Sequence, residues 1–150
     1  KREQFFDEIK DKALAYGIGE ASCEVIDEIN ILEATKLAMK RAIDEADKML
    51  ESKGRDRIQI VIFDAVKIND LKKEQMSVIK GDQTYFSVAA ASILAKVTRD
   101  NLMKEYDKVY PEYGFASNKG YGTAKHIEAL KVCGACDIHR RTFIGNFVGE

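Results

Sequence analysis

The sequence predicts an α/β fold, in which helices flank a β-sheet. Its clearest strand is the run at residues 58–63, where every residue except Gln59 is β-branched or aromatic. Since apolar residues occupy both faces of this run, it is typical of a strand buried within a sheet. Before and after it, apolar residues recur at the three-to-four-residue spacing of helices. The order of these segments favours a mixed sheet.

The N-terminal segments are expected to form two helices separated by a short strand. Helical spacing of apolar residues predicts a helix over residues 2–16, and a strand follows at residues 16–21. Asn30 and Glu33 have the spacing of a capping box, so the second helix is expected to begin at Asn30 and to end near Leu50.

The C-terminal segments are expected to form a second strand and two more helices. A charged loop leads to the strand at residues 76–79. From about Thr84, apolar and small residues recur at helical spacing, which predicts a long helix that ends before Pro111. Thr123 is expected to cap a short helix at residues 124–132.

Composition and charge restrict the class of protein. The chain has 150 residues, of which 45% are hydrophobic and 33% charged, so a disordered or fibrous chain is excluded and one domain over residues 1–150 is expected. The formal net charge of −1 excludes nucleic-acid binding by bulk electrostatics alone, although a local basic groove is compatible with it. No apolar run approaches the roughly 20 residues of a membrane span, and three cysteines do not form a disulfide framework. We therefore expect a cytoplasmic protein without membrane association.

Two aspartates that follow strands are candidate metal ligands. Asp64 ends the buried strand, and Asp82 lies between the second strand and the long helix. Ligands of open α/β sheets bind at the carboxyl ends of the strands, and converging carboxylates repel each other unless a proton or cation lies between them. Oxygen ligands favour Mg²⁺ or Mn²⁺ over zinc. For each aspartate alone, the alternative is a turn or helix-capping role.

The loop at residues 112–122 and the basic residues near it are a candidate nucleic-acid interface. Aromatic residues and glycines alternate there with Lys119, and Lys125 follows. Aromatic rings can stack on a base or sugar, and lysines can pair with phosphates. Arg140 and Arg141 add a basic cluster near the C-terminus. The alternatives are a structural loop with buried rings, which the pattern alone favours, and a solvated charged surface.

Cys133 and Cys136 form a CxxC pair, a spacing found in zinc sites and in redox pairs. His139 is the only further ligand nearby in the sequence, and there is no second CxxC pair. The pair also follows a short helix, whereas a thioredoxin-type pair precedes a long one. A thiol-redox or zinc module is therefore kept only as an alternative function.

Several segments resemble the bacterial ribonuclease HII family, in the order in which that family has them. The most specific is Lys80-Gly81-Asp82 followed by the alanine-rich stretch at residues 87–100. The resemblance covers essentially the whole chain. The further matching segments are residues 30–35, 113–115, 118–123, His126 and 138–143.

The resemblance implies a ribonuclease H-like fold with a C-terminal helical extension. It also implies an endonuclease that cleaves RNA in RNA–DNA hybrids and cuts 5′ of ribonucleotides embedded in duplex DNA, using Mg²⁺ or Mn²⁺ in two-metal catalysis. Of the family's four metal-binding acids, Asp64 matches the third and Asp82 the fourth, and Tyr121 matches the tyrosine that stacks beneath the sugar at the RNA–DNA junction. Candidates for phosphate pairing, each of which could instead form a surface ion pair, are Lys96, Arg99, Lys119, Lys125, Arg140 and Arg141.

The family's opening Asp-Glu-Ala-Gly-Arg-Gly segment is absent from this chain, since nothing before Gly17 resembles it. In the family, that segment supplies the other two acids and the backbone that reads the 2′-hydroxyl. Smaller departures are Ala65, where the family often has glycine, and residues 134–137, which replace a proline-bearing turn.

The departures lead to two expectations about this chain. With two of the four acids, it is expected to be inactive alone, and a fragment that binds hybrid duplex without cleaving it is the alternative. Because the first strands of the family are missing, strand edges should be unpaired, so we expect dimerisation or strand exchange although the family is monomeric.

Overall fold

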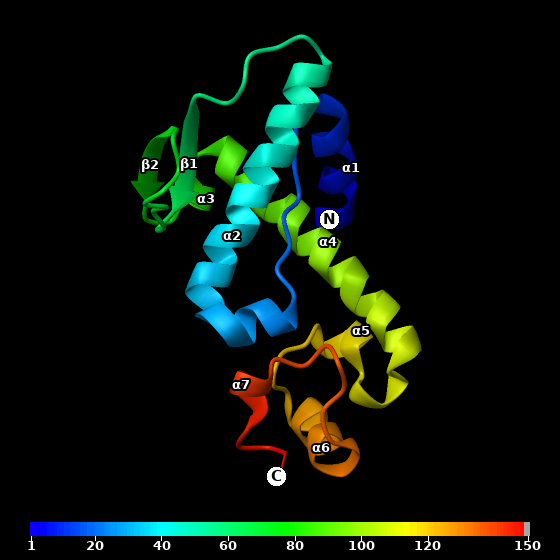
Figure 1. Cartoon of the computed structure of the whole chain (residues 1–150). Coiled ribbons are helices and arrows are strands. Elements are labelled where there is room, and N and C mark those ends of the chain that lie inside the picture. The colour runs from blue at the N-terminus through cyan, green and yellow to red at the C-terminus, as the bar shows by residue number, and fades with distance from the viewer. Residues whose placement is uncertain (149–150) are drawn as a thin grey trace. The chain divides into compact units, whose positions relative to one another are not determined.

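Helices make up most of the chain, and two strands pair with each other (Figure 1). This computed structural model describes residues 1–148. The strands are β1 (Ile60–Asp64) and β2 (Glu74–Val78), and η1 (Pro111–Tyr113) is a short 3-10 helix. The α-helices are α1 (Arg2–Lys12), α2 (Cys23–Ser52), α3 (Gly81–Thr84), α4 (Phe86–Val109), α5 (Phe115–Asn118), α6 (Ala124–Cys133) and α7 (Arg141–Ile144). Within residues 1–148, none of them is long and apolar enough to cross a membrane.

The described residues form two compact units, each with its own apolar core. Unit 1 consists of Lys1–Ala21 and Leu32–Val97, and unit 2 consists of residues 22–31 and 98–148. The core of unit 1 is formed by Ile43, Phe63 and Ile68. The core of unit 2 is formed by Met103, Tyr113, Phe115, Leu130 and Ile144. That residues 1–150 fold as one domain stays a prediction.

The sheet of unit 1 confirms the predicted α/β class. β1 and β2 are parallel, with Asp64 paired to Val78, and they lie within two residues of the predicted strands. The prediction that β1 is buried on both faces is wrong for the described residues, because Ile60 is 53% exposed. Between the strands, Gln75 holds the connecting loop, since it accepts from the Ile68 N–H over 3.0 Å and donates to the Ile68 carbonyl over 2.8 Å.

The strand predicted at residues 16–21 is absent, because this segment lies against a helix instead of another strand. A Cβ on Gly17 would lie 2.0 Å from the carbonyl oxygen of Ala42 in α2, so only glycine permits this approach. The Ile18 N–H donates to the side chain of Glu45 over 2.9 Å. Arg41 of α2 likewise donates to the Glu20 carbonyl over 2.6 Å, so two backbone groups of this segment are bound by side chains of α2.

The beginning of α2 also differs from the prediction. The helix begins at Cys23, and Asn30, the predicted N-cap, lies inside it with φ 71° and ψ 165°. Asn tolerates positive φ better than most residues, so it accommodates a kink there. By contrast, the predicted cap of α6 is confirmed, because Thr123 Oγ1 accepts from the backbone N–H of His126.

Candidate functional site

The two predicted metal ligands lie at the carboxyl edge of the sheet in unit 1. Asp64 ends β1, and Asp82 lies in the first turn of α3, which follows β2. The N–H of Gly81 donates to Asp64 Oδ1 over 3.1 Å. Gly81 is buried, and a Cβ there would lie 3.7 Å from Asp64 Cα. The structure therefore brings Asp64 against the residue that precedes Asp82.

The turns after the two strands place both exposed aspartates at this edge. Ala65, after β1, has φ 54°, and Lys80, two residues after β2, has φ 56°. The left-handed region costs an L-residue roughly 1–2 kcal/mol, a cost that glycine avoids. The Ala65 N–H still donates to the Val78 carbonyl over 2.9 Å, so strand pairing extends one residue beyond Asp64.

Asp64 and Asp82 suit a divalent cation by donor type but not by number. Carboxylate oxygens are the ligands that Mg²⁺ and Mn²⁺ prefer. Among residues 1–148, however, no three His, Cys, Asp or Glu side chains lie close enough together to hold a metal ion. That Asp64 and Asp82 bind a metal ion therefore stays a prediction, and within residues 1–148 they have no third ligand beside them.

The predicted nucleic-acid loop in unit 2 has buried aromatic rings and one exposed ring. Tyr113 and Phe115 belong to the core, with their ring centroids 5.4 Å apart, so the structural alternative applies to them. Tyr121 is 65% exposed. The buried Asn118 closes the turn between them, because it donates to the Tyr113 carbonyl over 2.6 Å and accepts from the Gly120 N–H over 2.8 Å. Only the Tyr121 ring is thus placed to meet a ligand.

Two arginines lie beside this loop. A Cβ on Gly120 would lie 3.3 Å from Arg99 Nη2, so glycine leaves room for the guanidinium. The Arg140 guanidinium lies 4.1 Å from the centroid of the Phe143 ring. Burial, followed by the nearby positive charge of Arg99, lowers the pKa of Arg140. The nearby carboxylate of Asp27 acts in the opposite direction on this pKa, so Arg140 already has an anionic neighbour.

The other predicted phosphate contacts are distributed over both units. Lys96 belongs to unit 1 with the two aspartates, whereas Lys119, Lys125 and Arg141 belong to unit 2 with Tyr121. Lys119 Nζ donates to the Ala116 carbonyl. The backbone N–H of Arg141, at the start of α7, donates to an Asp27 carboxylate oxygen over 2.7 Å.

Neither cysteine of the CxxC pair forms a disulfide in the structure. Cys133 is exposed, and Cys136 is partly buried with its Sγ 3.1 Å from Nδ1 of His139. Burial raises the pKa of the Cys136 thiol, so the thiolate needed for metal binding or redox exchange is disfavoured. His139 also forms a hydrogen bond with His126, a pairing that the sequence does not indicate.

A comparison with protein families decides where the chain belongs. The family model described as Ribonuclease HII matches residues 1–146. The chain belongs to the ribonuclease HII family. It is 52% identical over 144 residues to the ribonuclease HII of Caldanaerobacter subterraneus subsp. tengcongensis, an alignment that covers 96% of this chain and 56% of the relative.

Two further ribonucleases HII are similar to nearly the whole chain. Those of Ruminiclostridium cellulolyticum and Acetivibrio thermocellus are 49% and 50% identical over 148 residues, and each alignment covers 99% of this chain and 55% of the relative. The chain thus spans about half the length of the curated relatives it matches. Membership in the ribonuclease HII family confirms the predicted family, whereas the roles of Asp64, Asp82 and Tyr121 stay predictions.

Proposed function

We propose that this chain supplies two metal-binding carboxylates and a sugar-contacting loop to an endonuclease. Its substrates would be RNA in RNA–DNA hybrids and ribonucleotides embedded in duplex DNA. The main support is the contact between Asp64 and Gly81, which places Asp64 and Asp82 at one sheet edge in a chain of the ribonuclease HII family. As a second candidate function, binding of hybrid duplex without cleavage is favoured by the shortage of a third ligand within residues 1–148.

Asp64 and Asp82 would hold the divalent ions, either Mg²⁺ or Mn²⁺. When bound in pairs, such ions activate a water and stabilise the leaving 3′ oxygen. The Gly81 N–H fixes the orientation of the Asp64 carboxylate by donating to Oδ1. Within the described residues, Oδ2 of Asp64 accepts no hydrogen bond from the protein, so it is available to a cation.

Tyr121 would stack on the sugar at the junction, and basic residues would pair with phosphates. The 2′-hydroxyl is the group by which a protein distinguishes RNA from DNA. Among the basic candidates, Arg140 is the best prepared, because the Phe143 ring already orders its guanidinium. The other candidates for phosphate pairing are Lys96, Arg99, Lys119, Lys125 and Arg141.

The proposal predicts that the 150-residue chain alone does not cleave, since it has two of the family's four acids. The purified chain is incubated with a DNA duplex that contains one ribonucleotide, in Mg²⁺ and then in Mn²⁺. We expect cleavage only when a second polypeptide with the Asp-Glu strand is added. An all-DNA duplex is the control. Cleavage by the chain alone would contradict the incomplete site, and no cleavage with the added strand would contradict the proposed function.

The open sheet also predicts association of this chain. Within the described residues, β1 and β2 have only each other as neighbours, and the apolar side chains of Ile60, Met76 and Ile79 are exposed beside them. Exposed strand edges favour pairing with another chain. We expect a concentration-dependent dimer in size-exclusion chromatography with light scattering, and a shift towards monomer in Ile79→Lys. A monomer at every concentration would contradict this prediction.

A further inference from the structure

Two buried histidines of unit 2 face each other. His126 lies on α6 and is 4% exposed, and His139, which precedes α7, is 6% exposed. Their Nε2 atoms are 3.0 Å apart. At this distance one nitrogen must donate a hydrogen and the other must accept it. The two rings therefore cannot both be charged.

The neighbouring backbone groups determine which nitrogen donates. The N–H of Cys136 donates to Nδ1 of His139 over 3.0 Å, so the hydrogen of neutral His139 is on Nε2. His139 Nε2–H then donates to Nε2 of His126. The hydrogen of His126 is therefore on Nδ1, which donates over 2.9 Å to the carbonyl oxygen of Tyr121. We call this series, from the Cys136 N–H through His139 and His126 to the Tyr121 carbonyl, the histidine bridge.

The surroundings of the histidine bridge favour neutral rings. The Phe115 ring lies edge-on to His126, with centroids 5.4 Å apart, and the Tyr113 ring lies 4.8 Å from His139. Burial, followed by the electrostatic effect of His126, lowers the pKa of His139. The positive charge of Arg141 acts in the same direction, and a hydrogen bond with the Cys136 backbone acts against it without reversing the shift. The other titratable groups that face the pair are the Cys136 thiol and the Tyr113 phenol, whose pKa values are raised by burial, so both are neutral near pH 7.

The carbonyl held by the histidine bridge belongs to a glycine-rich backbone segment whose N–H groups are bound by Asn118. The Gly120 N–H donates to Asn118 Oδ1 over 2.8 Å and the Tyr121 N–H donates to the Asn118 carbonyl over 2.9 Å, whereas the Tyr121 carbonyl depends on other partners. Gly120 and Gly122 flank Tyr121, and glycine permits backbone conformations that other residues avoid. The Tyr121 carbonyl accepts a second hydrogen bond, from the Thr123 N–H over 2.8 Å. Two donors thus fix one carbonyl in a glycine-rich segment whose side chain is exposed.

We propose that His126 and His139 are positioning residues, which fix the Tyr121 backbone and thereby set where its ring meets a ribonucleotide sugar. This inference rests on the proposed function of Tyr121. Neither histidine touches the substrate. The Cys136 N–H is part of the histidine bridge, because it determines which nitrogen of His139 bears the hydrogen.

The first test determines which nitrogen of each histidine ring bears a hydrogen in the unliganded 150-residue chain. Long-range ¹H–¹⁵N NMR at pH 7.5 distinguishes protonation at Nδ1 from protonation at Nε2. We expect the hydrogen of His139 on Nε2 and that of His126 on Nδ1. A charged ring, or a hydrogen on Nδ1 of His139, overturns the histidine bridge. This test needs no variant and no substrate.

The second test compares two substitutions at His126. Asn places an amide donor near the position of Nδ1, whereas Phe keeps the ring and removes the donor. We expect the Tyr121–Thr123 amide hydrogens to exchange about fivefold faster in His126→Phe, the factor that one ordinary hydrogen bond contributes, and to remain near the wild-type rate in His126→Asn. Equal exchange in the wild-type chain and both variants overturns the proposal. If His126→Phe does not fold, the NMR measurement of ring protonation in the wild-type chain decides whether the histidine bridge exists.

The third test separates the positioning role from the function of Tyr121. Affinity is measured for a DNA duplex with one ribonucleotide and for the all-DNA duplex. We expect the preference for the ribonucleotide to fall about fivefold in His126→Phe, to recover in His126→Asn and to be lost in Tyr121→Ala. An unchanged preference in Tyr121→Ala contradicts the proposed sugar contact, and the first two tests then still decide whether the bridge holds the backbone. A preference lost equally in Asn and Phe variants overturns the positioning role.

Discussion

Replacing Asp82 by Asn is expected to reduce ribonucleotide-dependent cleavage about 1,000-fold, in an assay where a second polypeptide supplies the other acids. Asn keeps the size of the side chain but removes the negative charge that would hold a divalent ion. Metal ions contribute several kcal/mol of transition-state stabilisation, and about 1.4 kcal/mol corresponds to a factor of ten in rate. The initial rate of cleavage of the single-ribonucleotide duplex is the measurement.

Asp70→Asn is the matched control for this experiment. Asp70 is another exposed carboxylate of unit 1, and it forms an ion pair with Lys40. Such exposed pairs contribute little, so the rate should change less than about twofold. A rate for Asp82→Asn within tenfold of the unsubstituted chain would show that Asp82 is not a metal ligand.

Replacing Asp47 by Ala is expected to lower the free energy of unfolding of unit 1 by about 3–5 kcal/mol. Asp47 of α2 is buried, and its Oδ2 lies 2.7 Å from Lys73 Nζ. The two side chains also bind the backbone of Ile58, since the Ile58 N–H donates to Asp47 Oδ1 over 2.8 Å and Lys73 Nζ donates to the Ile58 carbonyl over 2.7 Å. The change leaves the mostly buried ammonium of Lys73 without its partner.

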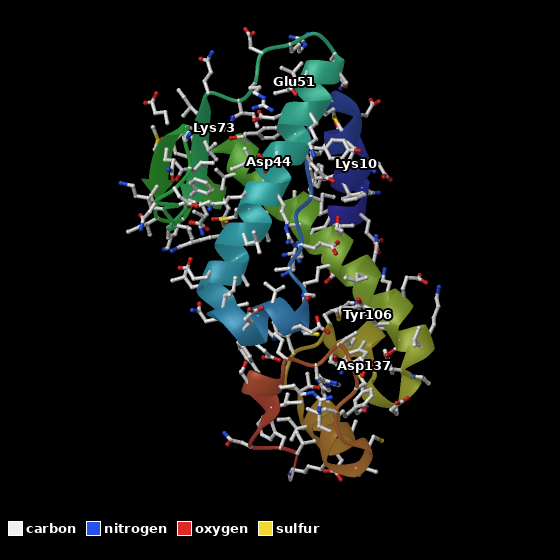
Figure 2. The ribbon with its side chains drawn as sticks, in the orientation of Figure 1. Lys10, Asp44, Glu51, Lys73, Tyr106 and Asp137 are labelled. Carbon is white, nitrogen blue, oxygen red and sulfur yellow. The ribbon has the colours of Figure 1, made fainter. Side chains whose placement is uncertain are left out.

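Urea denaturation of the wild-type and variant chains measures this cost. Asp44→Ala is the matched control, because Asp44 lies on the same helix and is exposed (Figure 2). It should change stability by less than about 0.5 kcal/mol. The double variant Asp47→Ala/Lys73→Met should recover part of the loss, since it removes the unpaired charge. A loss below about 1 kcal/mol in Asp47→Ala would contradict the structural role of the pair.

The same ion pair makes stability depend on pH in the acid range. Burial acts to raise the pKa of Asp47, but the Lys73 hydrogen bond and the Ile58 N–H outweigh it, so the pKa lies below its ordinary value of 3.8. As pH falls, the unfolded chain therefore binds the proton first. The contribution of Asp47 is complete above the unfolded pKa and is lost as pH falls through the folded pKa. Asp47→Asn should remove this part of the pH dependence.

The sequence predicted those elements whose own residues contain the signal. The cap of α6 could be predicted because Thr123 and the N–H that it binds are only three residues apart. Asp64 and Asp82 could be placed after the two strands because an apolar pattern precedes each of them. Segments whose partners are distant in sequence were predicted less well. Residues 16–21 form no helix or strand, and the close approach of Gly17 to the Ala42 carbonyl places them against α2, a contact between segments distant in sequence.

The least predictable part of the candidate site is the contact between side chains from separate segments. His126 and His139 each lie in a segment that resembles the ribonuclease HII family, but nothing in either segment indicates that their Nε2 atoms lie 3.0 Å apart. Arg99 and Arg140 likewise come from different elements, and only the folded chain shows that one lowers the pKa of the other. Local spacing determines caps and strand ends, whereas tertiary packing determines such pairs.

The hydrogen bonds of Asn118 also bear on the thermodynamics of recognition. This carboxamide binds the loop at Tyr113 and at Gly120 in the unliganded chain. Much of the conformational entropy of the turn is therefore lost when the chain folds and not when a nucleic acid arrives. Preorganised loops retain more of their contact energy as affinity. A sugar stacked on Tyr121 would thus meet a surface already in its bound shape, and differences in affinity between related duplexes should arise mainly in the dissociation rate.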